Sequence, residues 1–106
     1  MREPTFLILT ALADRPRHGY GIVREVGVLS DGRVSLLTGT LYTALDRLAA
    51  EGLVELDHEE EVDGRLRRYY RLTGEGLAAL TAETARLRQL TTAAEERLRS
   101  VRPRTA

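Results

Sequence analysis

Residues 54–72 alternate between apolar and polar side chains around an Asp63-Gly64 pair, whereas the segments on either side repeat apolar residues every three or four positions. A period of two is typical of β-strands, and the longer period is typical of helices. A hairpin must therefore lie between helical segments. In a chain of 106 residues, the length of one domain, this order predicts short helices, a hairpin and a final helix.

Three helical segments precede the hairpin. They are predicted to run from Pro4 to before Pro16, over residues 19–30 and over residues 39–51. Asp31-Gly32 ends the second helix, Thr38 is the expected N-cap of the third, and Gly52 follows its last turn. Residues 34–36 alternate weakly, as a very short strand would. Three helices within 52 residues have the length of a helix-turn-helix unit.

Two registers compete in the hairpin. A two-residue Asp63-Gly64 turn pairs Leu56 with Arg71, whereas a three-residue loop over residues 62–64 pairs Leu56 with Tyr70. We favour the longer loop, because it matches apolar residues on one face and charges on the other. In that register four acids face the second strand: Glu55 opposite Arg71, Asp57 opposite Tyr69, Glu59 opposite Arg67 and Glu61 opposite Arg65.

The helical period returns at residue 74 and continues for roughly 25 residues, longer than most globular helices. Its heptad-like seam steps by three and four, at residues 77, 80, 84, 87, 91, 94, 98 and 101, and is apolar except at Thr84 and Thr91. So narrow a stripe on a long helix favours a partner helix, and we expect a homodimer. The expected interface consists of Phe6, Leu9, Leu77, Leu80, Leu87, Leu98 and Val101. The terminal residues 102–106 are expected to be frayed.

Composition narrows the possible functions. The 16 arginines and 16 acids cancel, so net charge offers no argument for nucleic acid. The absence of cysteine excludes disulfides, thiolate zinc sites and cysteine nucleophiles. The two histidines lie on different predicted elements, and no common catalytic or nucleotide-binding motif is present, so we assign no enzyme activity, cofactor or metal. No apolar run exceeds four residues, which predicts no membrane contact and a cytoplasmic location.

Four motifs in order resemble the PadR family of bacterial transcriptional regulators. They are His18-Gly19-Tyr20-Gly21-Ile22, Gly39-Thr40-Leu41-Tyr42, Glu51-Gly52-Leu53-Val54 and Arg67-Arg68-Tyr69-Tyr70-Arg71-Leu72-Thr73 with Gly76. The resemblance covers residues 4–80; Gly21 departs from the polar residue more usual in the first motif. It implies an α+β, mostly helical winged helix-turn-helix over residues 1–73 and a C-terminal dimerisation helix with its tail over residues 74–106. It also implies that the third helix enters the major groove of double-stranded operator DNA while the wing contacts the flanking backbone.

The predicted DNA-binding residues come from these two elements: Thr38, Thr40, Tyr42, Thr43 and Arg47 on the third helix, and Arg65, Arg67 and Arg68 on the wing. Each has a structural alternative. The threonines could simply be surface residues of an ordinary helix, and Tyr42 could be an aromatic side chain packed against the protein. The arginines could form cross-strand ion pairs. Arg68, which faces no acid in the favoured register, and Arg65 near the tip are the strongest candidates. The expected function is repression from an inverted-repeat operator; the alternative is a protein-interaction module without sequence-specific DNA binding.

The identity of a small-molecule effector is not predicted. Some small members of the family resemble multidrug sensors that stack flat aromatic compounds on tryptophan at the dimer interface. This chain has no tryptophan, and its last helix has no aromatic residue. We therefore expect no tight binding of flat aromatic dyes.

Overall fold

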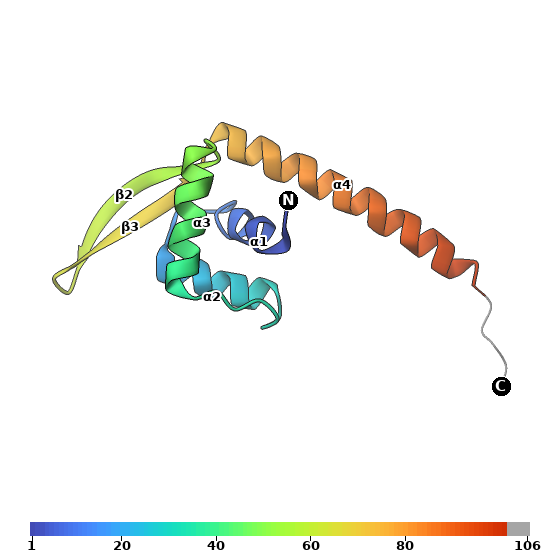
Figure 1. Ribbon diagram of the computed structural model, residues 1–106, viewed down its shortest axis with the longest axis horizontal. Helices are drawn as coiled ribbons and strands as arrows, with labels where there is room; N and C mark the ends of the chain where they lie inside the picture. The colour runs from blue at the N-terminus through green and yellow to red at the C-terminus, as the bar shows by residue number, and fades with distance from the viewer. Residues whose placement is uncertain (102–106) are drawn as a thin grey trace.

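The computed structural model describes residues 1–101, and the predicted frayed tail at residues 102–106 lies outside the described residues. The elements in chain order are α1 (Glu3–Ala11), β1 (Arg17–His18), α2 (Gly19–Leu29), α3 (Thr38–Ala50), β2 (Val54–Val62), β3 (Arg65–Leu72) and α4 (Gly74–Arg99). The fold is α+β and mostly helical, as predicted. The β2–β3 hairpin, called the wing from here on, extends to one side of the three short helices, and α4 extends to the other (Figure 1).

The apolar faces of the three short helices meet in one core. Its largest side chains are each at most 2% exposed: Ile8 and Leu9 of α1, Ile22 and Val26 of α2, Leu41, Leu45 and Leu48 of α3, and Val54 of β2. Burial of one such side chain contributes about 1.5–3 kcal/mol. The three leucines therefore fix the orientation of α3, and the opposite face of that helix remains in solvent.

Left-handed residues end the helices where the sequence predicted. Asp31 and Gly32 have φ values of 54° and 78° after α2, and Gly52 has a φ of 79° after α3. The predicted N-cap of α3 was wrong, because Leu37, not Thr38, occupies that position. Leu37 is extended and its carbonyl accepts the N–H of Leu41, so helical geometry already begins at Thr38.

The sheet has three antiparallel strands in the order β1-β3-β2. Its third strand is β1, where Arg17 pairs with Tyr70 and His18 with Tyr69; this strand was not predicted from the sequence. Two residues are too few to display a period. Residues 34–36 form no strand in the described chain; Val34 and Leu36 instead pack, partly buried, against the helical core.

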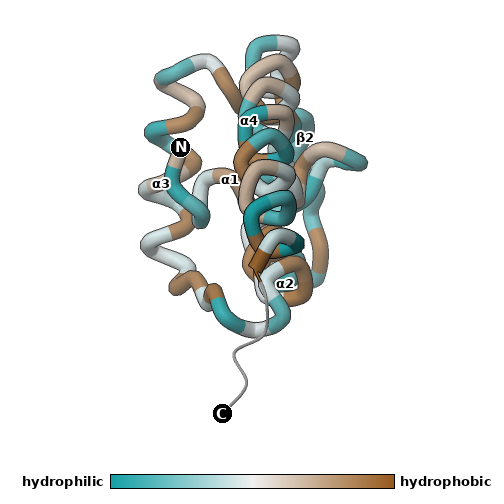
Figure 2. The backbone as a smooth tube through the Cα atoms, turned by 90° about the vertical axis from the view of Figure 1, so that its right-hand side faces the viewer, coloured by the Kyte–Doolittle hydropathy of each residue, from teal (hydrophilic) through white to brown (hydrophobic). Residues whose placement is uncertain are grey.

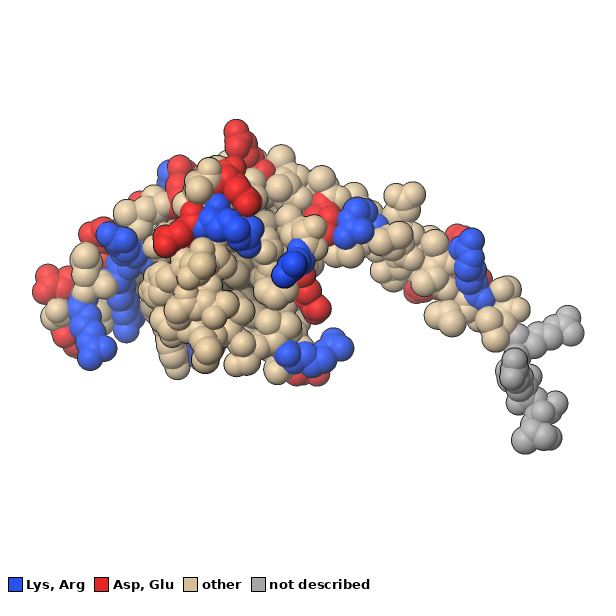
Figure 3. Space-filling model, viewed as in Figure 1, with Lys and Arg blue, Asp and Glu red and all other residues tan. Residues whose placement is uncertain are grey.

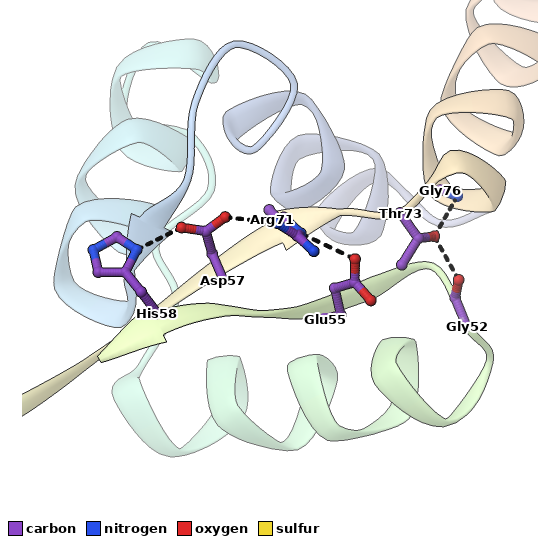
Figure 4. A network of polar contacts seen from close by, with 7 residues as sticks. All are labelled: Gly52, Glu55, Asp57, His58, Arg71, Thr73 and Gly76. Carbon is purple, nitrogen blue, oxygen red and sulfur yellow. Dashed lines mark hydrogen bonds and ion pairs between the residues drawn. The ribbon is translucent and has the colours of Figure 1, made fainter. Parts of the chain in front are cut away.

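Thr73 joins the end of α3 to the start of α4. Its hydroxyl accepts a hydrogen bond from the Gly76 N–H at 2.9 Å and donates one to the Gly52 carbonyl at 2.6 Å (Figure 4). Gly76 is necessary here, because a Cβ at that position would overlap the Leu53 carbonyl. The first turn of α4 is thereby held against the helical body.

The later part of α4 continues beyond the body, with apolar positions recurring along its length (Figures 1 and 2). Its buried residues, Gly76 and Leu80, both lie near its beginning. The radius of gyration is 17.4 Å, against about 13 Å for a compact domain of this length. Within residues 1–101, none of the helices combines the length and apolarity needed to span a membrane.

Candidate nucleic-acid interface

The first two turns of α3 present an uncharged surface. Leu37, Thr38, Gly39, Thr40, Tyr42 and Thr43 are all exposed there, and Leu37 is 77% exposed. Within the described residues no side chain caps this helix, so its first backbone N–H groups can meet an anion. Few charged atoms lie over the lower part of α3, whereas basic side chains gather on the neighbouring wing (Figure 3).

Two side chains on this surface are already engaged with the protein. The Thr43 hydroxyl donates to the Gly39 carbonyl at 3.0 Å. The Tyr42 ring lies over Gly19, where a Cβ would come within 2.5 Å of the phenolic oxygen. Tyr42 is nevertheless 40% exposed, so it packs against α2 and also presents polar edge to solvent. Gly19 is therefore required for Tyr42 to adopt this position.

Both candidate registers occur in the wing. Leu56 pairs with Tyr70 as favoured, but His58 pairs with Tyr69, and from there to the tip the register is that of the two-residue turn. A β-bulge at Asp57 separates the two parts. Asp63 and Gly64 have φ values of 52° and 74°, which suits a two-residue hairpin turn. The prediction of a three-residue loop at the tip was therefore wrong.

The bulge changes the ionic partners of the wing arginines. Glu59 now lies opposite Arg68, and their side chains form an ion pair at 3.5 Å, contrary to the expectation that Arg68 faces no acid. Arg67 lies opposite Glu60, and Arg65 lies opposite Val62. Within residues 1–101 neither Arg65 nor Arg67 forms an ion pair, although both were expected to face acids at pairing distance.

A polar chain fixes the base of the wing next to the bulge. Arg71 donates to Glu55 at 3.0 Å, as predicted, and to Asp57 at 3.1 Å (Figure 4). The other carboxylate oxygen of Asp57 lies 2.5 Å from Nδ1 of His58. The hydrogen bond with His58, followed by that with Arg71, holds the pKa of Asp57 below its ordinary 3.8 despite partial desolvation. The bulged residue is thus bonded on both sides.

One groove of about 540 Å³ brings the candidate residues of helix and wing together. Its lining includes Thr38, Tyr42, Arg65, Arg67 and Arg68 from the predicted set. The groove is also lined by His18, Leu66 and Tyr20, which is 73% exposed. None of the three was predicted from the sequence to bind DNA. The exposed aromatic of the first motif, next to the turn before α2, was the signal that could have identified Tyr20.

His18 belongs to a row of rings across the three strands. The ring centroid of Tyr69 lies 5.2 Å from that of His18 and 4.3 Å from that of His58, and the latter pair is stacked. Burial, and then the charge of Arg67, lower the pKa of His18, while Glu60 acts in the opposite direction. Across residues 1–101 no three potential ligands from His, Asp or Glu come together as a metal site.

Arg47 lies apart from the other candidates. It sits near the end of α3, where its guanidinium pairs with Glu51 at 3.4 Å and donates to the Thr5 hydroxyl at 3.0 Å. These contacts direct it toward the start of α1. The structure therefore brings Thr38 and Tyr42 to the wing arginines but leaves Arg47 at the opposite end of the helix.

The expected dimer residues divide into two groups. Leu9 and Leu80 belong to the core of the protomer, with 0% and 7% exposure, so they are not part of its outer surface. Leu77, Leu98 and Val101 are exposed, and Phe6 and Leu87 are partly so and line a groove between α1 and α4. Leu90 is exposed beside them and was missing from the predicted seam, although its spacing of three from Leu87 was visible.

A family model described as "Transcriptional regulator PadR-like family" matches residues 8–82. The chain belongs to this family. The transcriptional regulator Rv3488 of Mycobacterium tuberculosis is 42% identical over 83 residues, which cover 78% of this PadR-like chain and 74% of the relative. Uncharacterized protein X of Lysinibacillus sphaericus is 31% identical over 75 residues, covering 71% and 69%.

Solved PadR structures have the same architecture. The crystal structure of a PadR family transcription regulator from Clostridium difficile aligns with a TM-score of 0.76 at 26% identity, covering 92% of this chain and 99% of that one. A PadR-like transcription factor from Bacteroides fragilis aligns with a TM-score of 0.72 at 28% identity, covering 87% of this chain and 86% of that one. This PadR-like protein is therefore a transcriptional regulator with a winged-helix DNA-binding fold, and its family is one of regulators rather than enzymes.

Proposed function

We propose that this PadR-like regulator binds an inverted-repeat operator as a homodimer and represses transcription by blocking access of RNA polymerase. The main support is the groove between α3 and the wing, which places an uncharged helix N-terminus beside three arginines. DNA offers base edges in its major groove and phosphates on either side. The uncharged helix suits the base edges, and the arginines suit the phosphates.

The wing arginines have unequal roles in this proposal. Arg65 and Arg67 form no ion pair within residues 1–101, so they can contact phosphate without giving up a protein partner. Arg68 must first exchange Glu59 for phosphate. Arg47, in contact with Glu51 and Thr5 at the other end of α3, contributes least. Tyr20 and Tyr42, which line the protein groove, offer hydroxyl groups to the phosphates of the DNA backbone.

Dimerisation is assigned to α4 together with α1. The second half of α4 has no protomer element against it in the described chain (Figure 1), yet it exposes Leu90 and Leu98, and the exposed Val101 follows its last turn. A second copy supplies an equivalent apolar face across a twofold axis, which is the commonest arrangement of soluble dimers. Two reading helices related by such an axis match an inverted repeat.

The test is a salt titration of binding to the DNA that flanks the coding region, compared with random DNA of equal length. Arg65→Ala and Arg67→Ala should weaken binding to both DNAs and lower the salt slope by about 0.9 for each phosphate that the arginine neutralised, or about 1.8 per dimer. Thr40→Ala and Thr43→Ala should reduce the preference for the operator by about 1–3 kcal/mol for each base that the threonine reads. Arg15→Ala, which removes an equal charge outside the groove, is the matched control.

A protein-interaction module would behave differently. Its binding to DNA would be weak and without sequence preference, and the arginine variants would leave the salt slope unchanged. Either result would contradict the proposed DNA-binding function. Transcription from the flanking promoter, measured with and without the protein, tests repression separately.

A further inference from the structure

The predicted DNA-binding unit lacks the side chains that read adenine. Residues 1–73 contain no asparagine and no glutamine, and the one glutamine of the chain, Gln89, lies in α4. In the major groove, adenine is read mainly by the paired hydrogen bonds of an Asn or Gln amide, and guanine by those of arginine. Adenine recognition by a carboxamide is therefore not available to this helix.

The usual guanine reader is also missing from the part of α3 that faces the groove. Its one arginine, Arg47, lies nine residues after Thr38, or about 13 Å along the helix axis. That guanidinium is engaged with Glu51 and the Thr5 hydroxyl. The exposed side chains from Leu37 to Thr43 contain neither a guanidinium nor an amide.

What this surface does offer is methyl groups. Leu37 exposes an isobutyl group, and Thr38, Thr40 and Thr43 each carry one methyl beside the hydroxyl. The Thr43 hydroxyl already bonds to the Gly39 carbonyl, which leaves the methyl as the group available for recognition. Gly39 adds no side chain among these residues, and within residues 1–101 no atom beyond its own helical turn and chain neighbours lies within 4 Å of the position of its absent Cβ. A base edge can therefore approach the helix backbone closely there.

We propose that the first two turns of α3 recognise thymine through its C5 methyl group, so that T·A pairs in each half-site are read by apolar contact with Leu37, Thr40 and Thr43. Thymine is the one DNA base that displays a methyl group in the major groove. The inference rests on the proposed function, because it requires that α3 enters that groove.

The test replaces thymine by deoxyuridine, position by position, in the flanking DNA fragment that the full-length protein binds specifically. This replacement removes a methyl and leaves the base-pairing groups unchanged. At one or more positions of the half-site, binding should weaken about fourfold per methyl removed, and about sixteenfold when both half-sites are changed. Unchanged affinity at every position would overturn the inference. It would also be overturned if binding weakened only when guanine was replaced by 7-deazaguanine, which lacks the N7 acceptor of the major groove.

Protein variants identify which residue of α3 contacts each thymine methyl group. Leu37→Ala, Thr40→Ser and Thr43→Ser each remove apolar groups, and at least one should abolish the deoxyuridine penalty at one position. Thr40→Val and Thr43→Val keep the methyl, so the penalty should persist in both. If the serine variants retain the penalty and the valine variants do not, the hydroxyls read the bases and the inference fails. Failure of the unmodified fragment to show specific binding would instead contradict the proposed function.

Discussion

His18 lies where DNA phosphates would change its protonation. It lines the groove with Arg67, whose charge adds to burial in lowering the pKa of the imidazole from 6.5. In the unfolded chain His18 binds a proton more readily, so the stability that its depressed pKa contributes is present above pH 6.5 and is lost as pH falls through the folded pKa. Phosphate in the groove has the opposite effect, because it stabilises the imidazolium.

The predicted consequence is that DNA binding takes up a proton. Affinity for operator and random DNA alike should rise as pH falls from about 8 to about 6. In the His18→Gln variant this dependence should largely disappear. His58→Gln is the matched control, because His58 is the other histidine of the chain and does not line the groove. Binding titrations at several pH values give the result, and an equal slope in wild type and His18→Gln would contradict it.

We expect Glu59 to oppose DNA binding through its ion pair with Arg68. The pair is exposed, so it contributes little to stability, but it occupies a guanidinium that lines the groove. Glu59→Gln should strengthen binding to any DNA and raise the salt slope by up to about 0.9 per protomer. Glu61→Gln removes the same charge two residues away, opposite Leu66, and should have a smaller effect.

A double-mutant cycle checks the cause. In an Arg68→Ala background the advantage of Glu59→Gln over Glu61→Gln should vanish, because the released guanidinium is no longer present. If the two glutamine variants remain indistinguishable in wild type, Glu59 acts only through its general negative charge.

At the level of elements, the sequence predicted the helices because each carries a long apolar repeat, and it failed where a segment is short or mixed. The two-residue strand β1 has no period to detect. In the wing, each of the two candidate registers was correct over one part of the hairpin. Asp63-Gly64 imposes the two-residue turn at the tip, while Leu56, Tyr70 and the core impose the other register at the base. A bulge reconciles them, and its position depends on the bonds of Asp57, which alternation does not reveal.

Helix α3 allows stability and DNA binding to be separated. Gly39→Ala should raise the free energy of unfolding by about 0.5 kcal/mol, because alanine favours a helix and no other part of the described chain obstructs its Cβ. If DNA approaches this turn closely, the same change should weaken operator binding. Gly27→Ala, at an equally open position in α2, should raise stability without affecting binding. Thermal melts and binding titrations of both variants are sufficient, and unaltered operator affinity in Gly39→Ala would show that α3 keeps its distance from DNA.

For the whole molecule, the decisive feature is the unpaired half of α4. Leu98 is 70% exposed in the protomer, so Leu98→Glu should leave the fold intact while placing a charge in the proposed dimer interface. We expect the dimer to weaken by about 3 kcal/mol, roughly a hundredfold in dissociation constant. Thr92→Glu, at an exposed position about 120° around the helix from Leu98, is the matched control. Sedimentation equilibrium distinguishes the two, and a wild-type protein that is monomeric at micromolar concentration would remove the proposed interface.

The apolar stripe on this long helix contains two kinds of leucine, which the sequence does not separate. A seam counted along one helix cannot separate leucines that face their own core from leucines that face a partner. Leu80 enters the core beneath α1 and Leu98 does not, although both occupy the same stripe. Leu9 is likewise in the core, because α1 buries residues on more than one face. The packing of α4 against α1 determines which of these leucines are buried in the protomer and which remain exposed.

The acidic edge strand β2 also opposes assembly of further copies of the protein through their sheets. In the sheet of the described chain, β3 is the one neighbour of this nine-residue strand, so the other edge of β2 is free. The strand contains Glu55, Glu59, Glu60 and Glu61. A second wing added edge to edge would bring carboxylates of the two strands within about 5 Å of one another, while the bend at Asp57 would disrupt the ladder. Growth by strand addition is therefore opposed, and a closed pair formed through α4 does not extend into a fibre.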